Sequence, residues 1–309
     1  GVLPRTVLVV VKSDLRPFSS KPGHFLSLKL RDFSGEIDAK MWETPTGLAK
    51  ELSAGTPVAV SGRISSWKDR IELILEKVEV LDPEMVDPSQ FLPRCSRSKE
   101  DLWRELQDIV ALVEDPSLSS LLNAFTSTKE LREQFIEAPA SRAWHHGYLS
   151  GLLEHTVSVA RISELVARDR KDVDLDMVLT GALLHDIGKV DDYRYDTVID
   201  HTLSGKLLGH IVSGHHRVQL LMDSIEDFPE EKKLRLLHII VSHHGKLEWG
   251  SPKTPKTIEA QIVHLADNMD ARVNGVGSIL EENREKPGDW SNYISLLGTD
   301  ILCKSDDSS

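Results

Sequence analysis

The chain contains very little cysteine: only Cys95 and Cys303 occur in 309 residues, and most of the chain separates them. This excludes a disulfide-stabilised framework and gives no cysteine spacing typical of a metal site. So few cysteines suit a reducing compartment, and we expect a cytoplasmic protein. No apolar run approaches the roughly 20 residues that a membrane-spanning helix needs. The opening stretch GVLPRTVLVVVKSDL does not resemble a signal peptide.

The chain also lacks an excess of positive charge. Its 37 Lys and Arg residues stand against 49 Asp and Glu, a net charge of −12 that argues against coating of duplex DNA. The charge is uneven, because residues 1–82 carry 12 basic against 11 acidic residues and the remainder carries 25 against 38. An anionic polymer would therefore be held by the first part of the chain or by bound metal.

The first 82 residues show the alternation of apolar and polar side chains that is typical of half-buried strands. The alternating segments are residues 6–12, 24–33, 36–42, 56–64 and 70–81. Turn signals such as Lys21-Pro22-Gly23 and Ser34-Gly35 separate them. Five short strands in so short a stretch predict a small closed barrel.

The rest of the chain is typical of helices. Residues 83–98 hold three prolines without a clean period and are predicted to be a linker, residues 99–290 a helical domain, and residues 291–309 a C-terminal tail. Ser98 with Asp101 and the Asp115-Pro116 pair predict helix starts. Further helices are expected at residues 150–168, 174–187, 203–222, 230–244 and 257–273.

Histidine and aspartate residues recur beside the apolar stripes of these expected helices. They are His155, His185, Asp186, His210, the pair His243-His244, and Asp267. A lone inward histidine is most often a hydrogen-bonded core residue, but so many inward imidazoles and carboxylates are costly unless something pairs them. A divalent cation does so, and imidazole with carboxylate suits Mn, Fe, Co, Ni or Zn. The pattern therefore predicts a metal site.

The order H…HD…H…H…D, with HDIGK intact at residues 185–189, resembles the HD phosphohydrolase superfamily, an all-helical fold. The resemblance implies one metal ion held by His155, His185, Asp186 and Asp267, and a second held by Asp186, His210 and His243. The sequence leaves open whether His243 or His244 is the ligand. Two such ions clamp the attacking and leaving oxygens of a phosphoryl transfer and lower the pKa of a bound water.

Three further residues are candidates for contact with substrate. Lys189 lies one turn after Asp186, where a cation can hold a phosphate oxygen. Since Gly188 marks a helix end, Lys189 can equally be a partner of the helix dipole. His145 and His146 precede the first metal-binding helix and can either reach substrate or lie at the surface. We expect Asp186 and Lys189 to be the catalytic residues.

The alternation in the expected barrel also predicts which side chains face outward. An outward face that mixes aromatic and cationic groups suits single strands, because bases stack on rings while cations follow the phosphates. The expected nucleic-acid-binding residues are Phe25, Lys29, Arg31, Lys40 and Trp42, with Trp67, Lys68 and Arg70 on a neighbouring hairpin. Alternatively, Phe25 and Trp42 pack under the linker or the helical domain.

The segment LSLKLRDFSGEIDAKMWE is similar to the OB-fold module of tRNA-anticodon-binding and related proteins. Together with HHGYLSGLLEHT, GALLHDIGK and SHHGKLEWGSP, it closely resembles the YhaM-type 3′→5′ exoribonucleases of bacteria. The resemblance implies a multidomain protein, with an all-β OB-fold barrel followed by an all-α HD helical bundle. It also implies hydrolysis of single-stranded RNA, or single-stranded DNA, to nucleoside 5′-monophosphates with two divalent ions, expected to be Mn or Co.

Two other functions remain open at this stage. One is an HD phosphohydrolase of nucleotides or cyclic dinucleotides, although the stretch HHGKLEWGSP lacks the GYP triplet of the cyclic-dinucleotide enzymes. The other is a non-catalytic RNA-binding regulator with a structural metal. We expect no membrane partner, and the sequence leaves the oligomeric state open.

Overall fold

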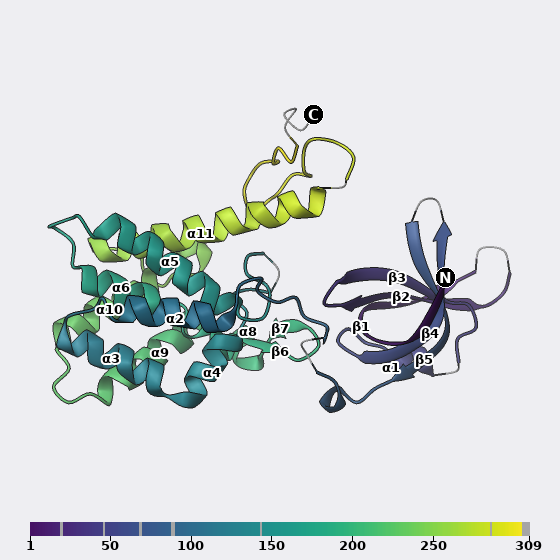
Figure 1. Cartoon of the computed structure of the whole chain (residues 1–309), viewed down its shortest axis with the longest axis horizontal. Coiled ribbons are helices and arrows are strands. Elements are labelled where there is room, and N and C mark those ends of the chain that lie inside the picture. The colour runs from purple at the N-terminus through teal and green to yellow at the C-terminus, as the bar shows by residue number, and fades with distance from the viewer. Residues whose placement is uncertain are drawn as a thin grey trace. The chain divides into compact units, whose positions relative to one another are not determined.

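The structure is a computed structural model of the whole chain (Figure 1). It describes residues 1–18, 21–45, 47–67, 70–87, 90–142, 144–284 and 286–304, with the backbone alone at Trp67 and Arg70. The chain divides into two compact units. The barrel unit comprises Gly1–Arg94 and Arg194–Asp200, and the helical unit comprises Cys95–Tyr193 and His201–Ser309.

Five strands form the closed barrel that the alternation predicts. They are β1 (Val2–Pro17), β2 (His24–Asp32), β3 (Gly35–Met41), β4 (Pro57–Trp67) and β5 (Arg70–Val80), with the short helix α1 (Leu48–Glu51) between β3 and β4. The strand order around the barrel is β1-β2-β3-β5-β4, and the β3–β5 pair is parallel. The barrel appears in purple and blue in Figure 1.

The interior of the barrel contains the residues that the period-two pattern points inward. Leu26, Leu28 and Leu30 are buried, and each pairs with an inward residue of β3. A glycine is required at Gly62, where the β4–β5 register shifts, because a Cβ atom there would lie 2.1 Å from the carbonyl oxygen of Ile74. The opposite faces of β2 and β3 are thereby turned outward.

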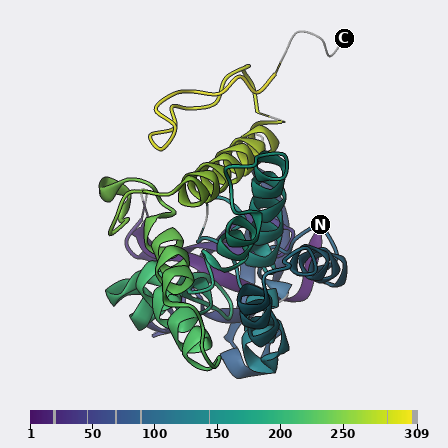
Figure 2. The same ribbon diagram turned by 90° about the vertical axis from the view of Figure 1, so that its left-hand side faces the viewer.

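Helices make up most of the second unit. They are α2 (Lys99–Val110), α3 (Pro116–Ser127), α4 (Lys129–Glu137), α5 (Gly151–Ala167), α6 (Leu175–Leu184), α7 (Lys189–Asp192), α8 (Leu203–Leu207), α9 (Gly209–Asp223), α10 (Glu230–Ser242) and α11 (Ile258–Asn283). Short 3₁₀ turns lie at η1 (Pro83–Met85) and η3 (Leu247–Trp249). Figures 1 and 2 show α11 lying along α5, and α5 also packs on α6.

The predicted helix starts are confirmed. The side chain of Ser98 accepts a hydrogen bond from the Asp101 N–H at the start of α2. Asp115 accepts from the Ser117 and Leu118 N–H groups at the start of α3, with Pro116 as the first helical residue. The prediction of a single helix at residues 203–222 is wrong. The helix is interrupted between α8 and α9, where Gly209 has a φ of 73°.

One other expectation needs correction. The chain after residue 98 is not wholly helical, since the strands β6 (Tyr193–Tyr195) and β7 (Ile199–His201) pair in a hairpin, in which Tyr193, Tyr195 and Ile199 favour extended backbone. The expected linker is packed at Phe91 and Leu92, which are fully buried.

The segment after α11, predicted as a C-terminal tail, contains internal hydrogen bonds over its described part. The Ser291 N–H donates to the Ile301 carbonyl at 2.8 Å, and the Ile294 N–H donates to the Thr299 carbonyl at 2.8 Å. These bonds close the segment on itself. Among the described residues, no helix combines the length and the apolar character that crossing a membrane requires.

Candidate metal centre

Polar residues from five places in the helical unit converge on one point. They are His155 on α5, His185 and Asp186 after α6, His210 in the first turn of α9, His243 and His244 after α10, and Asp267 on α11. The apolar stripes of these helices are buried, which turns the polar residues beside them inward. The structure therefore brings together the six residues that the sequence predicts as metal-binding and His244, the alternative to His243.

One group of donor atoms surrounds the Nε2 atom of His155. The Oδ1 atom of Asp267 lies 3.2 Å from it, and the Nε2 atom of His185 lies 3.3 Å from it. The Oδ2 atom of Asp186 lies 3.3 Å from both imidazole Nε2 atoms. His155, His185 and Asp267 can hold a metal ion together, and we call these three residues with Asp186 Oδ2 the first donor group.

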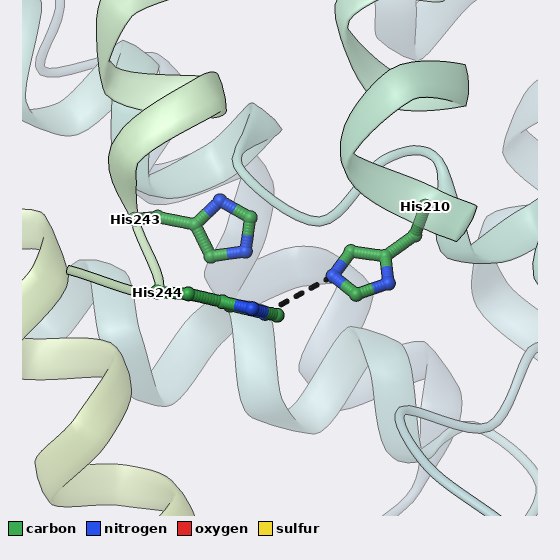
Figure 3. A group of neighbouring side chains, drawn as sticks. All are labelled: His210, His243 and His244. Atoms are coloured by element: carbon green, nitrogen blue, oxygen red, sulfur yellow. Dashed lines mark hydrogen bonds between the residues drawn. The ribbon is translucent and has the colours of Figure 1, made fainter. Parts of the chain in front are cut away.

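A second donor group lies on the other side of Asp186. Its Oδ1 atom is 3.5 Å from His243 Nε2 and 3.6 Å from His210 Nε2. His244 Nε2 lies 3.2 Å from His210 Nε2, and Figure 3 shows the three imidazole rings turned toward one another. These three histidines can hold an ion together. Both His243 and His244 direct a ring nitrogen toward the same point, so the geometry is compatible with either one as a ligand and with both.

The Nδ1 atoms of the imidazoles are anchored outward, so each Nε2 faces the centre. Carbonyl oxygens of Ala182, Ile240 and Trp249 accept hydrogen bonds from the Nδ1 atoms of His185, His243 and His244 at 2.8, 2.7 and 2.8 Å. Carboxylates take the same role for the other two rings. His155 Nδ1 is 2.7 Å from Asp270, and His210 Nδ1 is 3.3 Å from Asp192. A neutral imidazole that donates from Nδ1 presents an unprotonated Nε2, which is the form that binds metal.

The residues fit a divalent cation. Within the described part of the chain, the Oδ1 atom of Asp186 and the Nε2 atom of His243 are buried without a hydrogen-bond partner, whereas the Oδ2 atom of Asp186 is paired with Lys189. Buried polar atoms without a partner are costly, and a cation between them removes that cost. The close pairs of imidazole Nε2 atoms, 3.3 Å apart in His155 and His185 and 3.2 Å apart in His210 and His244, would repel one another when unprotonated, and the same ion would offset this repulsion. Two donor groups that share Asp186 offer room for one or two ions.

The pKa shifts of Asp186 and His155 also indicate a site suited to a cation. Burial alone would raise the pKa of Asp186, but Lys189 and His185 hold that pKa well below its usual value. Burial alone would lower the pKa of His155, but the surrounding carboxylates raise it. A negative field that draws a proton to His155 also draws a cation.

Burial lowers the pKa values of the second donor group. It lowers the pKa of His243 and that of His210, and it lowers the pKa of His244 to about 4. These three rings are therefore neutral at pH 7, as metal binding requires.

Lys189 lies inside the centre. It is the first residue of α7, and its ammonium Nζ is 2.5 Å from Asp186 Oδ2. Burial would lower the pKa of Lys189, but Asp186 raises it, so the side chain is a cation. The alternative role as a helix-dipole partner does not describe this position, because the ammonium group points at a carboxylate rather than at the carbonyls that end α6.

His145 and His146 have different positions. His146 is buried, so the surface alternative is wrong for it: Nε2 lies 2.9 Å from Asp270 Oδ2, and Nδ1 lies 2.7 Å from the Tyr148 hydroxyl. His145 lies beside the ring of His155 at 5.5 Å between centroids. Burial and the Lys189 charge lower the pKa of His145 to about 3.

Two carboxylates were missed by the sequence reasoning. Asp270 joins His146 and His155, and it also accepts from the Ser158 hydroxyl and from the Asn274 side chain at 3.1 Å. Asp192 orients His210. The signal for Asp270 was its place three residues after Asp267, on the same helical face.

On the barrel, the outward face carries a cluster of three aromatic rings. Phe25 and Trp42 have centroids 5.1 Å apart, and Phe18 lies 5.5 Å from Phe25 and 6.2 Å from Trp42. Trp42 is 42% exposed. Lys40 lies 5.9 Å from the centroid of the Trp42 ring. Phe18 had no place in the sequence prediction, because it follows the last alternating residues of β1.

The predicted cations of this face are only partly free. Lys40 pairs with Glu72 at 2.5 Å, and Lys29 pairs with Glu36 at 3.3 Å. Arg31 is half-buried, with its Nε atom lacking a hydrogen-bond partner among the described residues. Lys68 and the side chains of Trp67 and Arg70 lie outside the described residues.

Comparison with known protein families matches both units. Residues 8–81 match the model of the OB-fold nucleic acid binding domain. Residues 152–272 match the model of the HD domain. The chain joins an OB fold to an HD domain. An HD domain indicates a metal-dependent phosphohydrolase, so the two domains together fit a metal-dependent hydrolase of nucleic acids.

The HD domain match contains both donor groups and Lys189. It ends before the C-terminal segment that follows α11, and it begins after His145 and His146. The OB-fold match covers the ring cluster. Nucleic-acid contact and phosphoester hydrolysis are thus assigned to different parts of one chain.

Proposed function

We propose that this protein is a metal-dependent 3′→5′ exoribonuclease. It hydrolyses single-stranded RNA, or single-stranded DNA, and releases nucleoside 5′-monophosphates. The observation that carries the proposal is the position of Asp186, whose two oxygens face two groups of metal-type donors in a chain that also carries an OB fold. The 3′→5′ polarity and the product rest on the resemblance to YhaM-type enzymes. Its two reduced cysteines suit the cytoplasm.

Two divalent ions are proposed for the centre, with manganese as the first choice. His155, His185, Asp186 and Asp267 would hold one ion, and Asp186, His210, His243 and His244 would hold the other. Cobalt, iron, nickel and zinc suit the same donors. When bound, such ions supply a water of lowered pKa and stabilise the charge that develops on phosphate.

The side chains of the chain itself divide the remaining work. Asp186 links the two donor groups, since each of its carboxylate oxygens faces one of them. The ammonium group of Lys189 is fixed beside it and is able to hold a non-bridging oxygen of the phosphodiester. His145 is neutral at pH 7, with its Nδ1 atom buried and free of protein partners in the described chain.

The barrel face would hold the single strand that the centre cleaves. Exposed Trp42, backed by Phe18 and Phe25, offers a flat apolar surface for stacking of bases without strong sequence preference. An isolated nucleotide has only one base and gains little from such a surface. This favours a polymeric substrate over a nucleotide or a cyclic dinucleotide.

The non-catalytic alternative predicts a different centre. A purely structural metal is served by a closed set of ligands, whereas this centre also contains a buried lysine and lies beside a cavity. These features favour an enzyme over an RNA-binding regulator.

The test is a time course on a single-stranded RNA labelled at its 5′ end, with Mn²⁺ or with a chelator. We expect a metal-dependent ladder that shortens from the 3′ end, lost in Asp186→Ala and kept in Asp169→Ala, which removes an exposed carboxylate after α5. Turnover of a mononucleotide or cyclic dinucleotide, with the RNA left intact under every divalent metal, would contradict the proposal.

A further inference from the structure

A cavity of about 390 Å³ opens beside the metal centre. Its volume lies in the usual range of small-molecule sites. Its walls are formed by Trp144, His145, Lys189, His244, Trp249, Asp267, Asn268, Ala271, Arg272, Leu296 and Leu297. All of these residues belong to the helical unit.

The lining of the cavity is of two chemical kinds, which we call its metal end and its apolar end. One end is the metal centre itself, represented by Lys189, His244 and Asp267. The other is formed by two indole rings and by two leucines, Leu296 and Leu297. Metal binding and phosphate chemistry need no apolar wall, so the second end requires another explanation.

The two indole rings are held in place by their surroundings. A Cβ atom at Gly275 would lie 2.6 Å from the ring of Trp144, so α11 leaves room for this ring by carrying glycine there. The carbonyl of Trp249 accepts the His244 hydrogen bond, and Lys246 lies over its ring at 4.4 Å. Trp249 is nevertheless 40% exposed, which is a large aromatic surface to leave open beside a metal centre.

The leucines come from the C-terminal segment Trp290–Leu302, drawn in yellow in Figures 1 and 2. Its tip is a turn, in which Gly298 has a φ of 72° and donates its N–H to the Ile294 carbonyl at 2.8 Å. Leu296 is 64% exposed, although it lines the cavity. The turn therefore presents a largely exposed leucine to the cavity.

We propose that this apolar end receives the base of the nucleotide at the end of the strand from which hydrolysis begins. The inference rests on the exoribonuclease proposed above and names one feature of its substrate: a base-bearing terminal nucleotide. The terminal phosphodiester lies at the metal end, and the base lies between the leucines and the indole rings. Because apolar and aromatic walls contact the faces of bases rather than their edges, this site accepts any base.

The sharpest test compares two RNA oligomers that differ only in their last unit. One ends in an ordinary nucleotide and the other in an abasic ribose. We expect the wild-type protein with Mn²⁺ to remove the ordinary unit roughly tenfold or more faster, measured as kcat/KM, since base stacking accounts for such factors. The double variant Leu296→Ser/Leu297→Ser is expected to lose this preference, to within about twofold.

Two control variants distinguish a loss of base binding at the site from a general destabilisation of the C-terminal segment. Leu296→Met/Leu297→Met keeps an apolar wall and is expected to keep the preference. Tyr293→Ser changes an exposed residue of the same segment that does not line the cavity and is expected to behave as wild type. Thermal unfolding of each variant checks that the chain is folded.

The outcomes are distinguishable. A wild-type protein that removes both units equally fast, or a serine variant that keeps the wild-type preference, would overturn this inference alone. A wild-type protein that leaves the ordinary oligomer intact under every divalent metal would overturn the exoribonuclease proposal and this inference together.

Discussion

At the scale of single residues, the orientation of one imidazole is set by a carboxylate that the sequence reasoning missed. His155 directs its Nε2 atom at the centre because Asp270 accepts from its Nδ1 atom at 2.7 Å. Asp270 belongs to neither donor group and acts through the Nδ1 atom of His155. Partners of this kind set the orientation and basicity of a metal-binding histidine.

Asp270→Asn is therefore expected to weaken Mn²⁺ binding by about 10- to 100-fold, with a smaller effect on unfolding temperature. Ser158→Ala is the matched control, because it removes another contact to Asp270 and leaves the acceptor of His155 intact. The readout is Mn²⁺ titration of both variants. Equal Mn²⁺ affinities for Asp270→Asn and wild type would show that the carboxylate does not position His155.

The sequence could predict which residues converge but not how each is held. His155, His185 and Asp267 stand out because a polar group beside an apolar stripe is conspicuous in any sequence. The carbonyls of Ala182 and Ile240 leave no such mark, since every residue has one. Asp192 was missed because its partner His210 lies on the far side of a hairpin that was not predicted.

At the scale of elements, helix starts were the most predictable feature, and one of them is joined to a second helix. Asp115 caps α3, and its other carboxylate oxygen pairs with Lys232 of α10. Burial alone would raise the pKa of Asp115, but the bonds from Lys232 and Ser117 lower it to about 2. The unfolded chain, with a pKa near 3.8, therefore binds a proton first as pH falls.

Asp115→Ala is expected to lower the free energy of unfolding by about 1 kcal/mol at pH 7. The stabilisation is present above pH 3.8 and is lost as pH falls toward 2, so the gap between the two proteins should narrow in that window. Urea unfolding at a series of pH values measures it. Lys232→Met separates the ion pair from the cap, and a gap that stays constant down to pH 2 would contradict this account.

Element boundaries inside the helical unit were less predictable. The apolar period continues through residues 203–222, but Gly209 takes a left-handed conformation and separates α8 from α9. The hydrophobic period of a sequence predicts which residues face the core, but it does not reveal a single residue in a left-handed conformation. The same limit applies to Trp290–Leu302, whose internal hydrogen bonds follow no period.

At the scale of the whole molecule, we propose that one domain binds the nucleic-acid strand and the other hydrolyses it. The OB fold carries the ring cluster of Phe18, Phe25 and Trp42, and the HD domain carries the donor groups. The alternation of β2 and β3 predicted Phe25 and Trp42, whereas Phe18 joins them through the β1–β2 hairpin, where its N–H donates to the Gly23 carbonyl. The rest of the chain outside residues 1–82 has a net charge of −13, which bound cations would offset.

Trp42→Ala is expected to weaken binding of an RNA oligomer by a factor of roughly 5 to 150, equivalent to 1–3 kcal/mol of stacking. Hydrolysis of a small aryl phosphodiester at the metal centre should stay unchanged. Phe33→Ala is the control, since Phe33 is an exposed aromatic residue of the barrel outside the ring cluster. If Trp42→Ala lost RNA binding and hydrolysis of the small phosphodiester to the same extent, the proposal that the two domains have separate roles would be contradicted.

The central claim is that Asp186 joins two metal-binding groups, and titration with Mn²⁺ tests it most directly. The metal-free wild-type protein is predicted to bind two equivalents per chain. Asp186→Asn, which keeps the shape of the side chain but not its charge, is predicted to lose high-affinity binding of both. Asp186→Asn that binds Mn²⁺ with wild-type affinity and stoichiometry would contradict the account.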